Sequence, residues 1–352
     1  MPKRVGHLYE TLLDKTFIRT TIYKACLHRQ KRNDCSYVLR NIDRIVDDIH
    51  DMLADDSYTP SRYTEMLIYD QSSQKFRQIR TVPFFPDCII QWMIVEILKI
   101  PVFLRGMDYW CSASIPGRGG MRIYKGIKKY LKHHGPKYKK YALSADIYHY
   151  YDSIDIDILI KMLRRRIKDE RFLVLVEKVI RASSADGKTG IGIGYHLNQW
   201  MANFFLERLD RLIRKSGLVR WYGRYMDNLT IIGTNKRSLR KLIRRIWSYL
   251  DSVGLRLKSD YQIYHIDKRP IQAVGYRYIV NGKILLRKRN WLKLRRQAIR
   301  ITRKLYEGKE IPKTQARGFM SRFGSARKHS PSVKLFRAVG HIDFMEVRRI
   351  AA

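Results

Sequence analysis

The chain has 352 residues, 45% of them hydrophobic, and carries 71 Lys and Arg against 32 Asp and Glu, a net charge of +39. That apolar content supports a folded protein of about two domains and excludes a disordered chain. Because a compact body with this charge repels itself, a polyanion is expected as its partner, with nucleic acid favoured over an anionic membrane surface.

The most apolar stretch, 89–104, is predicted to be a buried helix. It contains Glu96 and Lys99 and is interrupted by Pro101, so we expect no membrane span. The four cysteines show no CxxC spacing, which favours buried free thiols in a reducing compartment. Since no apolar signal region follows the first residues, we expect a cytoplasmic protein.

The first part of the chain is predicted to be helical. Residues 1–32 are basic and mixed, and residues 36–55 place apolar side chains at helical spacing. Asp47, Asp48 and Asp51 fall on the other face of that helix. We interpret them as a solvated surface and not as a metal site.

Two strand patterns, 63–69 and 75–80, flank a polar turn at 70–74 and predict a β-hairpin. Alternate residues of a strand share a face, so Lys75 and Arg77 point the same way. They face either an anion or solvent, and the pattern alone does not separate these two interpretations.

A glycine-rich loop, 112–120, separates an apolar helix predicted at 87–100 from a basic helix predicted at 121–131. Loops of this kind let backbone approach a phosphate chain, and Arg118 adds a cation to this one. On its own the loop is weak evidence for a nucleic-acid contact.

A second glycine-rich segment, 189–195, leads into a helix predicted to continue to about residue 214. Its glycines keep side chains away, which would let a substrate approach the backbone. Asn198 and Gln199, in the first helical turn, would face the same space.

Two strand patterns end on carboxylates. The strand at 141–146 ends on Asp146, and a hairpin at 221–233 turns at Asp227 and Asn228. An isolated Asp-Asn turn is most often only a surface hairpin. Two Asp residues brought side by side on neighbouring strands, however, can hold Mg²⁺ and leave room for phosphates.

Beyond residue 282 Lys and Arg dominate. Trp291, Leu294, Ala298, Ile301 and Leu305 form one apolar stripe, and basic residues line the rest of the helix. Such a helix can lie along a phosphate backbone or on a membrane. In the tail, we expect three aromatic residues to anchor the core: Phe319, Phe323 and Phe336.

Taken in order, these motifs resemble those of bacterial reverse transcriptases over residues 60–340. The resemblance is carried by Asp146 with Tyr151, by 190–203, by Tyr225-Met226-Asp227-Asn228, by a predicted strand at 255–258, and by a turn at 274–276 that resembles the primer grip. Each motif alone is weak, whereas the five in this order and spacing are specific.

The resemblance implies an α+β fold shaped as a right-hand polymerase, with an antiparallel sheet flanked by helices. It implies an N-terminal helical region at 1–60, fingers at 61–140, a palm at 141–280, and a basic helical thumb with the C-terminal tail at 281–352. It further implies DNA synthesis from dNTPs on an RNA template.

The resemblance also implies roles for particular residues. Two Mg²⁺ ions, or Mn²⁺ in their place, would be held by Asp146, Asp227 and the Ile147 carbonyl, with Asn228 and Lys258 completing the catalytic group. Substrate would be bound by Lys75, Arg77, Tyr151, Gly194, Asn198 and Gln199, with Tyr151 excluding a 2′-hydroxyl. Nucleic acid would be held by Arg118, Lys293, Arg296, Arg300 and Arg303.

The chain departs from the family pattern at Asn228, where an Asp is expected, and at Asn198, where a Ser is expected. Asn keeps an oxygen donor but lacks the charge, so an RNA-binding protein on a weakened polymerase scaffold stays an alternative. The compact length resembles the enzymes of diversity-generating retroelements and those of antiphage defence, and the altered motif favours defence. The expected setting is the prokaryotic cytoplasm, with a structured noncoding RNA, the DNA product, and an accessory protein or a second copy as partners.

Overall fold

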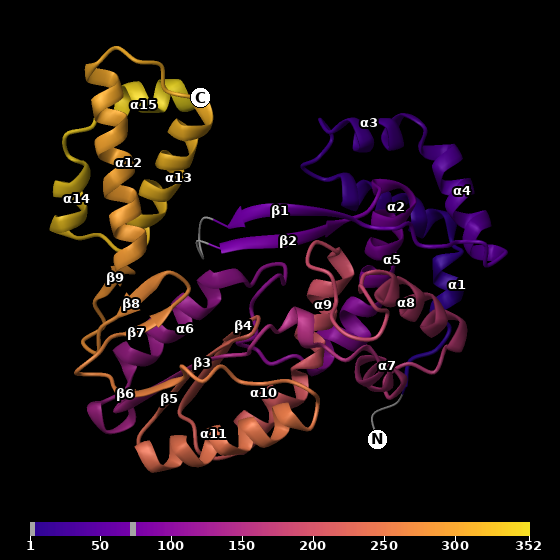
Figure 1. Cartoon of the computed structure of the whole chain (residues 1–352), viewed down its shortest axis with the longest axis horizontal. Helices are drawn as coiled ribbons and strands as arrows, with labels where there is room; N and C mark the ends of the chain where they lie inside the picture. Colours follow the sequence, from indigo (N-terminus) through magenta and orange to yellow (C-terminus); the bar gives the residue numbers. More distant parts are fainter. Residues whose placement is uncertain (1–3, 71–74) are drawn as a thin grey trace.

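The computed structural model describes residues 4–70 and 75–352, and Figure 1 shows its helices and strands. The first helices are α1 (Leu8–Leu12), α2 (Lys15–Cys26), α3 (Asn33–Arg40) and α4 (Ile42–Ala54). The single helix predicted over 36–55 is therefore two helices that meet at Asn41. The Asn41 side chain donates to the Tyr37 carbonyl (2.9 Å), and its backbone (φ −112°, ψ 31°) departs from helical geometry.

The acidic face predicted on this segment is a solvated surface. Asp47 on α4 pairs with Lys15 on α2 (2.7 Å), and Asp48 pairs with Arg44 (3.5 Å). These carboxylates are matched by cations, as ordinary surface carboxylates are, and the structure agrees with the interpretation made from the sequence.

The predicted hairpin is present as the antiparallel pair β1 (Thr64–Asp70) and β2 (Lys75–Thr81). In Figure 1 it extends from the helical body as a two-stranded ribbon. Beyond Asp70, the turn predicted at 70–74 lies outside the described residues. The base of the hairpin is fastened to the loop before α9 (His196–Phe205), because the Arg80 N–H donates to the Ile193 carbonyl (2.7 Å).

An apolar helical segment follows the hairpin. Its elements are η1 (Phe84–Cys88), α5 (Ile89–Leu98) and η2 (Lys99–Leu104), followed after the glycine-rich loop by α6 (Gly119–His133) and η3 (Pro136–Tyr138). Helix α5 is apolar on nearly every side and is buried in the main core. No helix in residues 4–70 and 75–352 combines the length and apolar character needed to cross a bilayer.

Four antiparallel strands form the central sheet, in the spatial order β4 (Trp221–Tyr225), β5 (Asn228–Gly233), β3 (Tyr141–Asp146) and β6 (Gln262–His265). Leu143 on β3 belongs to the same core cluster as the apolar residues of α11 (Lys236–Asp251). Ala142 belongs to a second cluster with residues of α6. Because side chains alternate along a strand, Asp146 lies on the face of Ala142, opposite α11.

The helices between β3 and β4 in the chain are η4 (Tyr151–Ser153), α7 (Ile156–Arg164), α8 (Glu170–Ala182), α9 and α10 (Glu207–Lys215). The helix predicted to continue to about residue 214 is interrupted at Leu206, whose backbone (φ −91°, ψ 4°) leaves helical geometry between α9 and α10. Antiparallel sheets flanked by helices confirm the predicted α+β class.

The chain ends in a small sheet and a helical bundle. The elements are β7 (Ile271–Ala273), β8 (Tyr276–Tyr278), β9 (Ile284–Leu286), α12 (Lys288–Tyr306), α13 (Lys313–His329), α14 (Val333–Val339) and α15 (Phe344–Ala351). Figure 1 shows the bundle standing apart from the helices of the N-terminal half.

The bundle encloses a hydrophobic core of its own. The stripe predicted on α12 contributes Leu294, Ala298 and Ile301 to it, and α13 contributes Phe319 and Phe323. The expectation for Phe336 was wrong, since its side chain is 45% exposed. The neighbouring residues of α14 that turn inward are aliphatic, so the aromatic ring is left on the outer side of that helix.

Candidate active site

Asp146 and Asp227 meet at one end of the central sheet. Asp146 is the last residue of β3 and pairs with Asn228, the first residue of β5. Asp227 precedes Asn228 in the turn between β4 and β5. The register of the sheet therefore brings together two carboxylates that are far apart in the sequence.

The turn lies one residue earlier than the sequence predicted. Tyr225 pairs with Asn228, so Met226 and Asp227 are the turn residues and Asn228 is part of β5. Met226 adopts φ 56°, a left-handed conformation that is uncommon for a residue other than Gly, Asn or Asp. Asn228 Nδ2 donates to Asp227 Oδ1 (3.1 Å), so this amide is a direct partner of the neighbouring carboxylate.

Burial, and then the negative charge of Asp146, raise the pKa of Asp227 to about 7. The charge of Lys258 opposes this shift, and Lys258 Nζ forms an ion pair with Asp146 Oδ2. Asp146 Oδ1 is buried and accepts no hydrogen bond from any described residue. A cation placed between two such carboxylates would reduce their repulsion and would give the Asp146 oxygen a partner.

The donor set fits Mg²⁺. This ion prefers oxygen ligands and is commonly bound by one or two carboxylates together with waters and substrate phosphates. In residues 4–70 and 75–352 no third Asp, Glu, His or Cys joins the pair, which leaves coordination positions for phosphates. The predicted third oxygen belongs to Ile147, a buried residue that directly follows Asp146 and bridges to Leu257.

The predicted strand at 255–258 is reduced to that single bridge. The Lys258 N–H donates to the Asp146 carbonyl (2.8 Å), which places the ammonium beside the carboxylates. The regular strand β6 begins only at Gln262. The segment therefore serves to position Lys258 more than to extend the sheet.

A buried arginine beneath the turn was missed by the sequence analysis. Arg224 is 0% exposed, and its Nε and Nη2 donate to the two carboxylate oxygens of Asp210 (2.7 Å each). Nη1 donates to the Met226 carbonyl (2.8 Å), and Nη1 and Nη2 donate to Asn203 (3.2 and 3.1 Å). These five bonds use all five guanidinium donors. The signal in the sequence was an Arg between Tyr222 and Met226 on one face of an otherwise apolar strand.

Tyr151 lies beside the same turn, as its predicted role requires. Its hydroxyl donates to the Met226 sulfur (3.5 Å). Burial, and then the charge of Asp227, raise the pKa of Tyr151 above its ordinary value, while the charge of Arg77 lowers it. Arg77 reaches this neighbourhood from β2, where its Nε donates to Asp70 (2.9 Å). Lys75 stands opposite Asp70 in the strand register.

The second glycine-rich segment is closely packed at Gly194 and at Asn198. A Cβ at Gly194 (φ 122°) would overlap the Arg80 carbonyl and lie 2.9 Å from a methyl carbon of Ile79. Asn198 is 0% exposed, and its amide donates to Ser183 Oγ (2.8 Å) and to a backbone carbonyl of the loop. Asn198 therefore faces the interior and not the space where we expected substrate. The backbone of Gly194 is exposed, and its assigned contact with substrate stays a prediction.

Gln199, one position further along α9, is half-buried, and its assigned role stays a prediction. Arg118 is also used differently from the expectation. Its Nη1 donates to the Asp108 and Cys111 carbonyls (2.9 Å each), and burial lowers its pKa. This side chain holds the backbone of its own loop.

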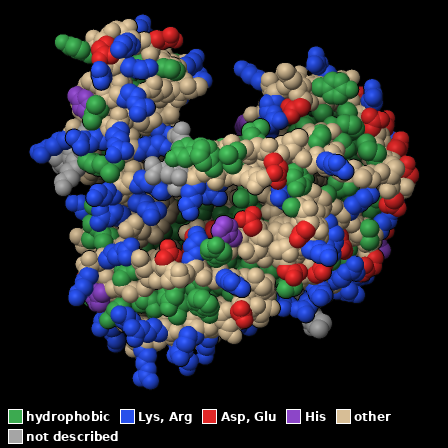
Figure 2. Space-filling view, viewed as in Figure 1, with side chains coloured by type: hydrophobic (Ala, Val, Ile, Leu, Met, Phe, Trp, Pro, Cys, Tyr) green, Lys and Arg blue, Asp and Glu red, His purple; other side chains and the backbone are tan. Residues whose placement is uncertain are grey.

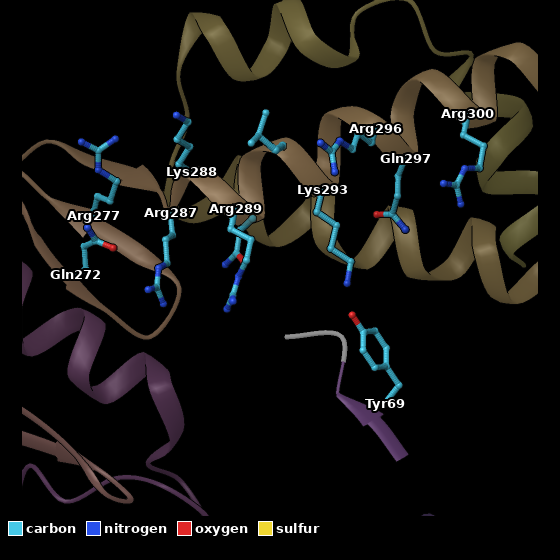
Figure 3. Close-up of a pocket in the computed structure, with 12 residues that line it drawn as sticks. Tyr69, Gln272, Arg277, Arg287, Lys288, Arg289, Lys293, Arg296, Gln297 and Arg300 are labelled. Atoms are coloured by element: carbon cyan, nitrogen blue, oxygen red, sulfur yellow. The ribbon is translucent and has the colours of Figure 1, made fainter. Parts of the chain in front are cut away.

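A basic cleft lies between the hairpin and α12 (Figure 3). Its volume is about 910 Å³. Tyr69 at the end of β1 lines one side, and Lys293, Arg296 and Arg300 of α12 line the other. Burial, and then the charges of two neighbouring arginines, lower the pKa of Lys293, so cations are crowded here. Arg303, predicted with them, pairs with a glutamate of its own helix (2.6 Å) and is not part of the cleft lining.

A family model described as reverse transcriptase (RNA-dependent DNA polymerase) matches residues 68–278, more than half of the chain. The chain belongs to this reverse transcriptase family. The match confirms the predicted class of enzyme, an RNA-directed DNA polymerase, and it spans both carboxylates, Lys258 and β2.

Relatives of this reverse transcriptase cover different shares of it. Protein YkfC of Escherichia coli K12 is 22% identical over 279 residues, 69% of this chain and 71% of YkfC. The group II intron-encoded protein LtrA of Lactococcus lactis subsp. cremoris is 28% identical over 170 residues, 46% of this chain and 27% of LtrA. The mitochondrial protein ymf11 of Marchantia polymorpha is 31% identical over 133 residues, 37% of this chain and 16% of ymf11.

The chain thus spans less than a third of the length of LtrA and of ymf11. Among solved structures, telomerase from Candida albicans in complex with a TWJ fragment of telomeric RNA is 12% identical, with a TM-score of 0.49, over 83% of this chain and 60% of the telomerase chain.

Proposed function

We propose that this reverse transcriptase extends a primer 3′-hydroxyl with dNTPs at Asp146 and Asp227. The observation that supports this most is the crowding of the two carboxylates, with the pKa of Asp227 raised to about 7 and one Asp146 oxygen left without a partner. Carboxylates arranged in this way favour a bound divalent cation over a structural role.

Each nearby side chain has a proposed task. Asp146 and Asp227, with the Ile147 carbonyl, would hold two Mg²⁺ or Mn²⁺ ions, which when bound supply Lewis-acid activation of the hydroxyl and neutralise charge on the leaving pyrophosphate. Lys258 holds a proton at Nζ beside Asp146 and donates it to the pyrophosphate. Tyr151, next to the turn, closes the space that a 2′-hydroxyl would need.

Substrate binding is assigned to the hairpin and α9. Arg77, with Lys75 beside it, binds the triphosphate, because the planar donors of Arg match phosphate oxygens. The Arg77–Asp70 pair is exposed and therefore weak, so a triphosphate can replace Asp70 as its partner. Gln199 positions the base of the nucleotide or template.

We assign the regions as an N-terminal helical region at 1–60, fingers at 61–140, a palm at 141–280 and a thumb at 281–352. The cleft lined by Lys293, Arg296 and Arg300 holds the template–primer duplex through its phosphates, which position a duplex without reading its sequence.

The finer function that we propose is antiphage defence with a dedicated structured noncoding RNA. The net charge of +39 and the altered turn motif support this assignment, and a diversity-generating retroelement is the alternative. Sequencing the nucleic acid that copurifies with the protein tests it. Recovery of one structured RNA joined to its complementary DNA is expected, whereas a random mixture of cellular RNA would contradict it.

The catalytic assignment is tested by Asp227→Ala, with Asp251→Ala as a matched control because Asp251 is exposed at the C-terminal end of α11. Primer extension on an RNA template should be abolished in the first variant and retained in the second. Extension that survives Asp227→Ala would remove the assignment.

Asn228 supports a second candidate, an RNA-binding protein with a weakened site. Asn228 lacks the charge that the family places there, and a carboxylate fewer weakens the hold on Mg²⁺. Asn228→Asp separates the two candidates. Unchanged or lower extension favours the active polymerase as it stands, and a large gain favours the weakened site.

A further inference from the structure

Helix α11 separates apolar and basic residues onto opposite faces. Leu239, Leu242 and Ile246 are fully buried against the sheet. The outer face, which we call the α11 basic face, consists of exposed Lys and Arg at six positions, namely Lys236, Arg237, Arg240, Lys241, Arg244 and Arg245. Figure 2 shows Lys and Arg side chains projecting from the lower edge of the molecule, where α11 lies in Figure 1.

The α11 basic face has no acidic counterpart. The side chains of its six members form no ion pair and no hydrogen bond with another described residue, whereas Asp47 and Asp48 of α4 are both paired. Its residues recur at i and i+4, for example Arg237 with Lys241, and like charges at that spacing destabilise a helix by about 0.2–0.5 kcal/mol per pair. A face that serves only for solvation would alternate the two signs of charge.

The basic residues border a shallow groove. Its volume is about 810 Å³, and it is lined along the helix by Arg237, Lys241, Arg244 and Ser248, with Leu218 from the loop after α10. The spacing i, i+4, i+7 and i+11 places these four on one line, which is about 16 Å long at a rise of 1.5 Å per residue. A line of cations along a groove matches a run of backbone phosphates.

The α11 basic face lies on the other side of the palm sheet from the carboxylates. Leu143 packs in the α11 cluster, while Asp146 belongs to the opposite face with Ala142. Nucleic acid that reaches the groove is therefore not the base pair being copied. A membrane is a poor occupant, because helices that bind membrane surfaces insert an exposed apolar face, and the apolar face of α11 is buried. Trp247 is the one large hydrophobic side chain of α11 that is exposed (43%).

We propose that the α11 basic face binds the phosphate backbone of RNA outside the copied region, as a second nucleic-acid surface of this reverse transcriptase. The identity of the polyanion as RNA rests on the proposed function. The second surface allows one structured RNA to present its template at Asp146 and Asp227 while a stem is anchored behind the palm.

The test compares two RNAs and two variants. One RNA is a long hairpin with a primed single-stranded extension, and the other is the primed extension alone. The test variant combines Arg237→Gln, Lys241→Gln and Arg244→Gln. The control variant removes the same charge elsewhere, through Lys161→Gln, Arg165→Gln and Lys188→Gln, all exposed. Thermal unfolding confirms that both variants fold.

The test variant should bind the hairpin RNA about 10- to 100-fold more weakly than the control at roughly 0.15 M salt, and its slope of log affinity against log salt should fall by about 2. Extension of the short primed RNA should be equal in both variants. Equal affinity and equal slope for the hairpin RNA would overturn the proposal.

Two further outcomes are informative. Binding of wild-type protein to phosphatidylserine vesicles that the test variant loses, with RNA binding unchanged, would overturn the proposal in favour of a membrane. Failure of the wild-type protein to extend the short RNA would refute the proposed polymerase function, yet the hairpin affinities would still decide whether α11 binds RNA.

Discussion

Replacing Arg224 should separate the stability of the palm from its catalysis. Arg224→Met leaves the Asp210 carboxylate buried, at 1% exposure, with the Tyr222 hydroxyl as its remaining side-chain partner. Breaking a buried ion pair in this way costs about 3–5 kcal/mol, a large share of the roughly 5–15 kcal/mol that stabilises a domain. The single variant is therefore expected to unfold at a much lower temperature and is a poor test of activity.

The informative variant is Arg224→Met combined with Asp210→Asn. It removes both charges, keeps an acceptor for the Tyr222 hydroxyl, and is expected to be far more stable than the single variant, since apolar replacement of a buried pair is often close to neutral. What it loses are the two bonds to Asn203 and the bond to the Met226 carbonyl, and only the last of these holds the turn itself. A bond from a charged donor contributes about 1.5–3 kcal/mol, so the Asp227 turn should lose alignment and kcat should fall about 10- to 100-fold.

The assay combines thermal unfolding with steady-state primer extension over a range of dNTP concentrations. We expect a folded double variant with lower kcat and unchanged KM for dNTP, and partial recovery in Arg224→Lys, which keeps the charge but has three donors. A folded double variant with wild-type kcat would refute the idea that Arg224 positions the catalytic turn. A change confined to KM would place its effect on nucleotide binding instead.

Three further predictions concern other parts of the site and the core. Tyr151→Ala should raise ribonucleotide incorporation relative to dNTP incorporation, and unchanged sugar selectivity would remove its proposed role. Gly194→Ala should destabilise the protein by about 1–3 kcal/mol in urea unfolding, because its Cβ would overlap the Arg80 carbonyl. The loss should exceed that of Gly187→Ala, where φ is also positive (70°) but the added Cβ meets open space. Burial lowers the pKa of His196 from 6.5 to about 4, so the unfolded chain takes up its proton first as the pH falls. The free energy of unfolding is therefore unaffected by His196 above about pH 6.5 and decreases as the pH falls toward 4. The expected decrease is about 2 kcal/mol between roughly pH 7 and 5, and His196→Gln should make it smaller.

The sequence predicted the elements whose patterns are local. The alternating strands at 63–69 and 75–80, the stripe on α12, and the strand that ends on Asp146 were found where expected, because hydrophobic periodicity is a property of neighbouring residues. The hairpin at Asp227 was also found, with its turn one residue earlier than predicted. The family motifs implied that Asp146 and Asp227 act together, whereas the register that pairs Asp146 with Asn228 came only from the structure, since neither strand alone encodes it.

The incorrect or overlooked assignments share a physical cause: the same polar side chain can bind a ligand or hold the protein's own backbone and side chains. Asn198 was expected to face substrate, yet it is buried and its amide donates to Ser183, a contact that only the tertiary structure reveals. Arg118 was predicted to bind nucleic acid and instead binds backbone carbonyls of its own loop. Arg224 was overlooked because only its partners identify an Arg as buried. Its partner Asp210 lies on α10, and the pattern of strand β4 carries no information about which helix residue contacts it.

The most direct test of the polymerase assignment is template-directed synthesis by the purified full chain. A primed RNA is copied with dNTPs in Mg²⁺, the experiment is repeated with a template of different sequence, and the products are sequenced. We expect DNA complementary to each template, and none when Asp227 is replaced by Ala. Absence of product with the wild-type chain, or product whose sequence does not follow the template, would contradict this expectation.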